Sequence, residues 1–259
     1  FAVGKGDSIL SEVPFRLSNK YIIVDGVGIA GGKSDQGEIV LLPYLKYKGI
    51  KKIDLAAVTH FDTDHALGII TLLKENKIKA LFLPLNHCQN YLSKKLYYFA
   101  NKYDVPIYKA KQGDLLKIGN MQLSILHPYQ NNTYLVQNRN NNSIVMKLNY
   151  KMFSLLLTGD LEKEGEMKLV RDNYDLHCQI LKLGHHGSNS STSPIFLEKV
   201  SPREGIISVG KNNYGHPADE VIERLDKFKI RKWITNNQGA IIVETDGNSY
   251  SIEGFCNIK

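Results

Sequence analysis

The chain has 259 residues, of which 42% are hydrophobic and 23% charged, a composition typical of a folded globular protein. Its formal net charge is +7, from lysines spread along the whole sequence, and this mildly favours a polyanionic partner, although such a surface also simply aids solubility. The sequence contains no apolar run that could span a bilayer and no signal peptide. Its three cysteines form no paired motif, so neither a disulfide framework nor a cysteine-based zinc site is indicated.

Short runs rich in Ile, Val, Leu and Phe, bounded by Gly, Asn, Asp or Pro, predict β-strands. These runs lie at residues 8–10, 21–24, 55–58, 80–84, 121–126, 144–148, 153–157, 179–183, 205–209 and 240–243. Helical periodicity occurs between some of them. The predicted helices lie at residues 38–48, 68–76, 93–103, 163–173, 193–199 and 218–228.

Many strands with helices distributed among them, and no internal repeat, predict an α/β fold in which helices cover the outer faces of two sheets. We expect one domain over residues 1–259 and a loop at the Asn-rich stretch 130–142. Cys88, Cys178 and Cys256 are expected to be packing residues. Because the chain opens at Phe1 without a methionine, we expect it to be a domain of a longer protein.

Four side chains that can bind metal follow the predicted strand at residues 55–58. They are His60, Asp62, Asp64 and His65. In an extended segment His60, Asp62 and Asp64 would share a face, with His65 turned back beside them. Imidazole and carboxylate ligands suit zinc or manganese, and such a mixed set can divide between two ions.

Two further strands end in groups of the same kind. Asp160 follows the strand at residues 153–157, and His185 and His186 follow the strand at residues 179–183. An Asp after Thr-Gly is more often a turn or helix-capping residue, and a His-His pair alone is equally ambiguous. Found together, each at the end of a strand, these residues predict a metal centre with two ions.

The sequence also resembles a known family. The segments Thr-His-x-Asp-x-Asp-His, Leu-Thr-Gly-Asp and His-His-Gly-Ser are similar to motifs of the metallo-β-lactamase superfamily, and within it to the hydrolase domain of the ComEC family of DNA-uptake proteins. The similarity extends over nearly the whole chain and includes residues 42–45, 59–65, 141–143, 157–160, 185–188 and 208–217. This resemblance implies an αββα sandwich with one or two metal ions at one edge of the sheets, and a hydrolase activity.

The resemblance also implies roles for single residues. His60 and Asp62 would bind the first metal, and Asp64, His65 and His186 the second. Asp160 would bridge the two ions, and Asp25 would support the site by hydrogen bonding to the loop that carries the ligands. Which histidine of the pair binds metal is open from sequence; we favour His186, which leaves His185 to face the substrate.

Departures from the superfamily pattern are informative. Many members have His where this chain has Asp62, and a further His where it has Asn142 and Ser143. The first metal site is therefore expected to be weak and to tolerate manganese. Hydrolysis of β-lactams is not expected for the same reason.

The expected mechanism is phosphodiester hydrolysis by a metal-bound hydroxide, because two cations about 3.5 to 4 Å apart lower the pKa of a shared water and neutralise a phosphoryl oxygen. The catalytic residues would be His216, His185 and Asp64, with His216 protonating the leaving oxygen unless it is only a turn residue before Pro217. Hydrogen bonds to the substrate are expected from four more side chains. They are Asn142, Ser143, Ser188 and Asn212.

The expected partner is DNA, preferably single-stranded, in an enzyme that is part of a membrane channel protein and lies on the outer face of the bacterial cell membrane. A chain that stood alone would be cytoplasmic or secreted. Two alternatives remain open: a phosphodiesterase for a non-nucleic ester, such as choline phosphate on a cell-wall polymer, and a catalytically inactive binding module.

Overall fold

The computed structural model describes residues 1–2, 4, 6–28, 35–85, 90–130 and 139–256. Its first sheet has five strands in chain order, β1 (Ile9–Phe15), β2 (Ser18–Val24), β3 (Leu55–Ala57), β4 (Leu81–Pro84) and β5 (Ile107–Ala110). The hairpin β1–β2 is antiparallel, whereas β2 to β5 run parallel to one another. The carboxyl ends of β2, β3 and β4 therefore meet at one edge of the sheet.

The second sheet has seven strands, which are also arranged in the order in which the chain makes them. They are β6 (Leu115–Ile118), β7 (Met121–His127), β8 (Val145–Tyr150), β9 (Phe153–Leu157), β10 (Ile180–Lys182), β11 (Glu204–Ile207) and β12 (Arg231–Ile234). Strands β6 to β9 are antiparallel and β9 to β12 are parallel. A separate hairpin follows, formed by β13 (Ile241–Thr245) and β14 (Tyr250–Gly254).

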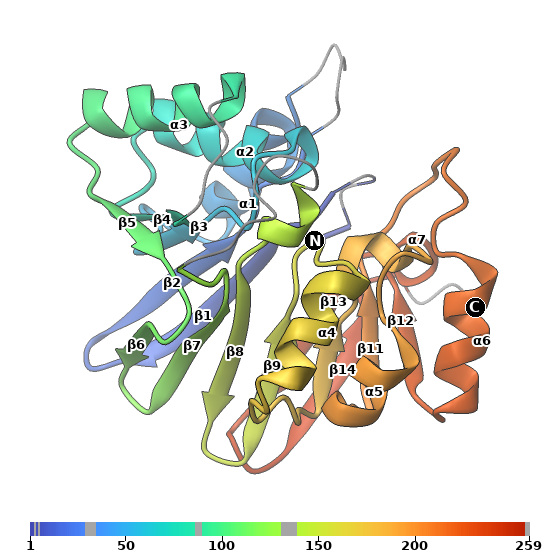
Figure 1. Ribbon diagram of the computed structural model, residues 1–259. Coiled ribbons are helices and arrows are strands. Elements are labelled where there is room, and N and C mark those ends of the chain that lie inside the picture. Colours follow the sequence, from blue (N-terminus) through green and yellow to red (C-terminus); the bar gives the residue numbers. More distant parts are fainter. Residues whose placement is uncertain (3, 5, 29–34, 86–89, 131–138, 257–259) are drawn as a thin grey trace.

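Helices cover the outer face of each sheet (Figure 1). The first sheet carries the π-helical turn η1 (Gly37–Leu41), α1 (Leu42–Tyr47), α2 (Thr63–Lys74) and α3 (Tyr91–Lys102). The second carries α4 (Lys163–Arg171), α5 (Pro194–Val200) and α6 (Asp219–Lys227). Short helical turns complete the chain at η2 (Asn140–Asn142), η3 (Gly184–Gly187) and α7 (Thr235–Gln238). The predicted αββα sandwich is confirmed.

Alternation along the strands builds three layers of core. In β2, Ile22 and Val24 point into the core between the two sheets, whereas Ile23 points outward to the core beneath α1, α2 and α3. Strand β3 repeats the pattern, with Ala57 between the sheets and Ala56 facing the helices. Successive side chains of a strand lie on opposite faces, so a continuous apolar run is what a strand buried on both faces requires.

Four strands were not predicted from the sequence. Three of them, β5, β6 and β12, are edge strands of the two sheets. Edge strands are half exposed and short, as in Leu115-Leu116-Lys117-Ile118, where exposed and half-buried residues alternate, so they lack the long apolar signal of central strands. The fourth, β14, belongs to the two-stranded hairpin.

Several smaller expectations have mixed outcomes. Cys178 is buried in the core beneath α4, α5 and α6, but Cys256 is exposed, so its assignment as a packing residue was wrong. Cys88 lies outside the described residues, as does 131–138 of the Asn-rich stretch, whose end forms η2. In the described parts of the chain, every helix is too short or too polar to cross a membrane.

Candidate metal centre

The candidate ligands lie where strands of both sheets end. His60 follows β3, and Asp64 and His65 lie in the first turn of α2. Asp160 follows β9, and His186 lies in η3 directly after β10. The expected extended conformation through Asp64 was wrong, because α2 already begins at Thr63.

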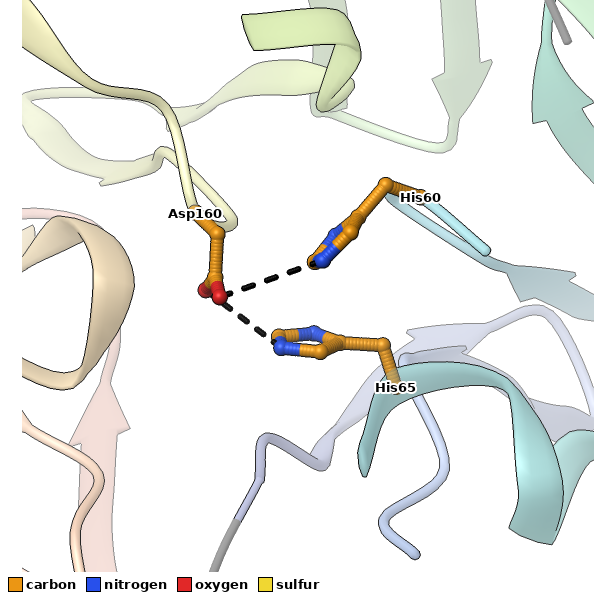
Figure 2. A group of neighbouring side chains, drawn as sticks. All are labelled: His60, His65 and Asp160. Atoms are coloured by element: carbon orange, nitrogen blue, oxygen red, sulfur yellow. Dashed lines mark ion pairs between the residues drawn. The ribbon is translucent and has the colours of Figure 1, made fainter. Parts of the chain in front are cut away.

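Asp160 stands between two groups of side chains. Its Oδ2 atom is 3.8 Å from Nε2 of His60, and its Oδ1 atom is 3.3 Å from Nε2 of His65, as Figure 2 shows. Nε2 of His186 also lies near this carboxylate, 3.6 Å from Oδ2 of Asp160, and it is 3.4 Å from Oδ2 of Asp64. Asp160 therefore belongs to two sets of three potential ligands, one with His60 and His65 and one with Asp7 and His186, and a further set joins Asp64, His65 and His186.

These atoms fit divalent cations. Among the described residues, the buried Nε2 atoms of His60, His65 and His186 and the Oδ1 atom of Asp160 lack a hydrogen-bond partner. Such atoms are costly to bury unless a partner such as a metal ion satisfies them. Imidazole and carboxylate together suit zinc or manganese.

The charges of the cluster also favour a cation. Burial opposes protonation of His186, but Asp160 and Asp7 outweigh it and raise the pKa of His186 to about 10. In the same way Asp160 and Asp25 raise the pKa of His65 despite its burial. By contrast, burial and then the charge of His65 lower the pKa of His60 to about 3. The carboxylates thus create a negative potential that imidazolium satisfies and that a divalent ion would satisfy better.

Asp62 is turned partly away from this cluster. Its Oδ2 atom lies 3.9 Å from Nε2 of His60, while its Oδ1 atom pairs with Nη1 of Arg139 at 3.0 Å. Burial raises the pKa of Asp62, and Arg139 opposes that shift. Asp62 thus stands at the rim of the cluster, shared between a candidate ligand and an exposed cation.

Asp25 supports the loop that carries the ligands. Its Oδ1 atom accepts a hydrogen bond from the backbone N–H of Thr59 at 2.7 Å, and its Oδ2 atom accepts one from the Thr59 hydroxyl at 2.8 Å. Nδ1 of His65 lies 2.9 Å from the same Oδ2 atom. A proton on Nδ1 directs the unprotonated Nε2 of His65 toward the cluster.

The two histidines of η3 differ in their surroundings. Nδ1 of His186 lies 3.0 Å from the carbonyl oxygen of Ser208, and its ring is inside the cluster. His185 is a quarter exposed, its Nδ1 atom lies 3.2 Å from Glu162 Oε1, and its Nε2 atom is 4.0 Å from Asp160. The structure thus brings His186 among the candidate ligands and leaves His185 at the cavity wall.

Two functional neighbours were missed in the sequence. Asp7 and Lys182 form a buried ion pair, with exposed side-chain fractions of 1% and 2%, and Oδ1 of Asp7 lies 3.5 Å from Nδ1 of His186. Gly6, the residue before Asp7, allows this segment to pack closely against Asp64, because a Cβ atom on Gly6 would lie 2.1 Å from the carbonyl oxygen of Asp64. A lysine inside a strand that is apolar on both faces was the one available signal, since lysine is almost never fully buried without a partner.

A cavity of about 190 Å³ opens beside the cluster, and its wall includes Asn140, Asn212, Tyr214 and His216. The ring of His216 lies 5.6 Å from that of His185, and its Nδ1 atom has no hydrogen-bond partner among the described residues. Burial, followed by the charge of His185, lowers the pKa of His216. His216 thus lines the cavity as a ring whose neutral form is favoured.

The side chains expected to hydrogen bond to substrate occupy different places. Ser143 is fully buried, and its hydroxyl accepts a hydrogen bond from the Asp160 backbone, so it supports the ligand loop. Asn142 and Ser188 are also buried, at 7% and 8% exposure. Asn212 reaches the cavity wall, but its amide is engaged with backbone atoms of the turn that carries His216. Asn140, which was not predicted, lines the cavity.

Comparison with known proteins agrees with this geometry. The ComE operon protein 3 of Bacillus subtilis is 34% identical in an alignment of 250 residues that covers 92% of this chain and 32% of that protein. The competence protein ComA of Neisseria gonorrhoeae is 28% identical over 240 residues, which is 92% of this chain and 30% of that protein. The chain thus spans about a third of the length of these curated relatives.

Among solved structures, Igni18, a metallo hydrolase of the archaeon Ignicoccus hospitalis, matches with a TM-score of 0.56 at 12% identity, over 90% of this chain and 94% of that one. This likeness concerns the fold. The αββα sandwich and the His and Asp cluster at its edge define a metallo-hydrolase.

The family follows from the sequence match. The chain belongs to the metallo-beta-lactamase superfamily, whose match covers residues 16–211. The resemblance to the ComEC family of competence proteins is confirmed by the relatives above.

Proposed function

We propose that this chain is a metal-dependent phosphodiesterase that cleaves DNA, preferably single-stranded DNA. The observation that carries the proposal is the position of Asp160, whose carboxylate lies within 4 Å of the Nε2 atoms of His60, His65 and His186, beside an open polar cavity. A shared carboxylate between two ligand sets is the arrangement that two-metal phosphoester hydrolysis requires. Support for DNA comes from the net charge of +7 and from a relative named as a competence protein, since competence is the uptake of DNA.

Each residue has a role in this proposal. The first metal would be held by His60 and Asp62, the second by Asp64, His65 and His186, and Asp160 would join the two. Bound divalent cations would supply an activated water and neutralise charge on the phosphoryl group. His216 would donate a proton to the leaving oxygen from the cavity wall, and His185 would hydrogen bond to a phosphate oxygen. Asp25 would keep the ring of His65 in its ligand orientation.

The first metal site is proposed to be the weaker one. Asp62 is shared with Arg139, and the buried Asn142 and Ser143 stand where many members of the superfamily have a histidine ligand. A site that mixes carboxylate and imidazole ligands tolerates manganese better than a site of three imidazoles does. We therefore propose manganese or zinc as the physiological ion.

The two other functions find less support. Recognition of choline relies on a cage of aromatic rings around the quaternary ammonium, and the described wall of the cavity contributes one tyrosine, Tyr214. An inactive binding module would leave the crowded carboxylates of Asp64 and Asp160 without a purpose. Metal analysis that finds well under one equivalent of zinc or manganese after loading would favour that module.

The test is cleavage of a labelled single-stranded oligonucleotide by the manganese-loaded protein, with bis-p-nitrophenyl phosphate and a choline phosphate ester as alternative substrates. We expect DNA cleavage that an Asp64→Ala/His65→Ala variant lacks. DNA cleavage no faster than that of the variant would refute the nuclease, and turnover of the choline ester alone would point to the second function.

The context of the chain is part of the proposal. We propose that residues 1–259 form one domain of a longer membrane-embedded DNA-uptake protein, located on the outer face of the cell membrane. Support comes from the curated relatives, of which the chain spans about a third. The sequence immediately before Phe1 tests this directly, since transmembrane helices there are expected.

A further inference from the structure

The outer face of α3 carries exposed aromatic rings in line with lysines. Tyr91, Lys95, Tyr98 and Lys102 are spaced four, three and four residues apart, a spacing that places them on one stripe of a helix. Tyr91 is 69% exposed and Tyr98 is 61% exposed. The apolar side chains of the helix, such as Leu96, pack on the opposite face against the core. The stripe therefore faces solvent and is not needed for packing.

The charge of this helix has one sign. Its twelve residues contain three lysines, Lys94, Lys95 and Lys102, and no acidic residue. Nζ of Lys95 lies 4.4 Å from the centre of the Tyr91 ring. A flat ring beside a cation offers both a stacking surface for a base and a charge for the neighbouring phosphate.

The stripe begins beside the metal centre. Asn90 caps α3, with its side chain accepting a hydrogen bond from Ser93 N–H at 2.8 Å, and its Nδ2 atom donates to the carbonyl oxygen of Phe61 at 2.9 Å. Phe61 lies between the candidate ligands His60 and Asp62. Tyr91, the first residue of the helix, is thus one residue away from a direct contact with the ligand loop.

We infer that the stripe formed by Tyr91, Lys95, Tyr98 and Lys102 binds the part of a single-stranded nucleic acid that extends beyond the metal centre. This inference rests on the proposed nuclease function and names the surface that would hold its substrate. The stripe is about 16 Å long, enough for a few nucleotides. Bases would stack on the two tyrosine rings, and phosphates would pair with the lysines, an arrangement that recognises single strands without reading their sequence.

An anionic membrane surface is the competing occupant, because lysines attract it too. A helix that lies on a membrane needs an apolar face directed at the lipid, and the apolar face of α3 is already covered by the core. Charge and stacking together fit a nucleic acid better than a lipid surface.

The experiment compares three forms of the full chain: unmodified, Tyr91→Ala/Tyr98→Ala, and Lys95→Gln/Lys102→Gln. Binding of a labelled oligothymidylate to metal-free protein, in which no strand is cut, is followed by fluorescence anisotropy at several salt concentrations. Turnover of bis-p-nitrophenyl phosphate by the manganese-loaded forms reports the metal centre, because this ester is too short to reach along α3. A Lys227→Gln/Phe255→Ala variant removes an exposed lysine and an exposed ring elsewhere and serves as the matched control.

We expect the tyrosine variant to bind DNA at least about 30-fold more weakly, as loss of stacking at two bases implies. The lysine variant should lower the slope of log affinity against log salt by about 1.4, which is about 0.7 for each lost phosphate contact on a single strand. Ester turnover and the control variant should be unchanged.

Affinity and salt slope equal to those of the unmodified protein would overturn the α3 surface while ester turnover still supports the phosphodiesterase. Binding of the three forms to phosphatidylglycerol vesicles is measured in parallel. If the variants lose vesicle binding while their DNA binding is unchanged, the proposal is overturned in favour of a membrane surface. Absence of oligonucleotide cleavage by the manganese-loaded unmodified protein would instead refute the proposed function, and the anisotropy would still decide whether α3 binds DNA.

Discussion

The carboxylate of Asp25 acts on the metal centre through other residues. It accepts hydrogen bonds from Thr59 and holds Nδ1 of His65. We predict that Asp25→Asn lowers metal affinity about 10- to 100-fold. The amide nitrogen would face a group that donates a hydrogen bond to the carboxylate in the unmodified protein, so that hydrogen bond would be lost. Competition with a chromophoric chelator measures the affinity.

Asp54→Asn is the control for this substitution, since Asp54 pairs with Lys20 and Lys79 away from the centre. Unchanged metal affinity in Asp25→Asn, or an equal loss in both variants, would contradict a positioning role for Asp25.

The buried pair of Asp7 and Lys182 makes a second prediction. Lys182→Met leaves the buried carboxylate of Asp7 without its cation, so we expect a loss of about 3 to 5 kcal/mol in the free energy of unfolding. The double variant Asp7→Asn/Lys182→Met removes both charges and should regain most of that loss. Urea unfolding measures the free energy of unfolding of the two variants. Equal destabilisation of both would show that the loss does not come from the unpaired charge of Asp7.

These residues also mark how far sequence reasoning reaches at this scale. The candidate ligands were found because each group is local and follows an apolar strand. Asp7 and Lys182 are 175 residues apart, and their pairing depends on the packing of two sheets, which a local pattern does not encode. The hydrogen bond between Ser143 and the backbone of Asp160 is likewise a tertiary contact that no local pattern encodes.

At the scale of elements, α2 is held against the turn after β2 by the close approach of two glycines. The backbone N–H of Gly26 donates to the carbonyl oxygen of His65, and that of Gly68 donates to Val27. A Cβ atom on Gly68 would lie 1.7 Å from the carbonyl oxygen of Gly26, a contact that only displacement of the helix could relieve.

We therefore predict that Gly68→Ala lowers the free energy of unfolding by about 1 to 3 kcal/mol. The variant should also bind metal more weakly, because α2 carries Asp64 and His65. Gly49→Ala is the comparison, since a Cβ atom there meets no other atom, although the positive φ of 67° adds local strain. Chemical unfolding and chelator competition measure both effects. Metal affinity that falls equally in the two variants would refute the role of the close approach.

Central elements were predictable and peripheral ones were not. Strand β3 is buried on both faces and reads as an unbroken apolar run, whereas β5 and β12 are edges whose exposed residues dilute that signal. Helix α2 was expected from residue 68 but begins at Thr63, because its first turn is made of polar ligands that conceal the helical periodicity.

For the whole molecule, the crowded charges of the centre predict strong stabilisation by metal. An ion that binds only the folded state adds about 2.7 kcal/mol when its free concentration is about 100 times the Kd. For a chain of this size we expect a rise in Tm of about 5 to 10 °C with manganese or zinc, reversed by a chelator. Calorimetry of the unmodified protein and of the Asp64→Ala/His65→Ala variant tests this, and an equal rise in both would place the stabilising ion elsewhere.

Both sheets are built from strands in chain order, β1 to β5 and then β6 to β12, so each sheet can form from a continuous half of the chain. The candidate ligands, however, come from both halves: His60 and His65 from the first, Asp160 and His186 from the second. During folding, strand pairing within either half cannot complete the metal centre, which exists only after the halves have docked. The rate at which a refolding chain binds metal would therefore report the rate of docking, separately from the rate at which the sheets form.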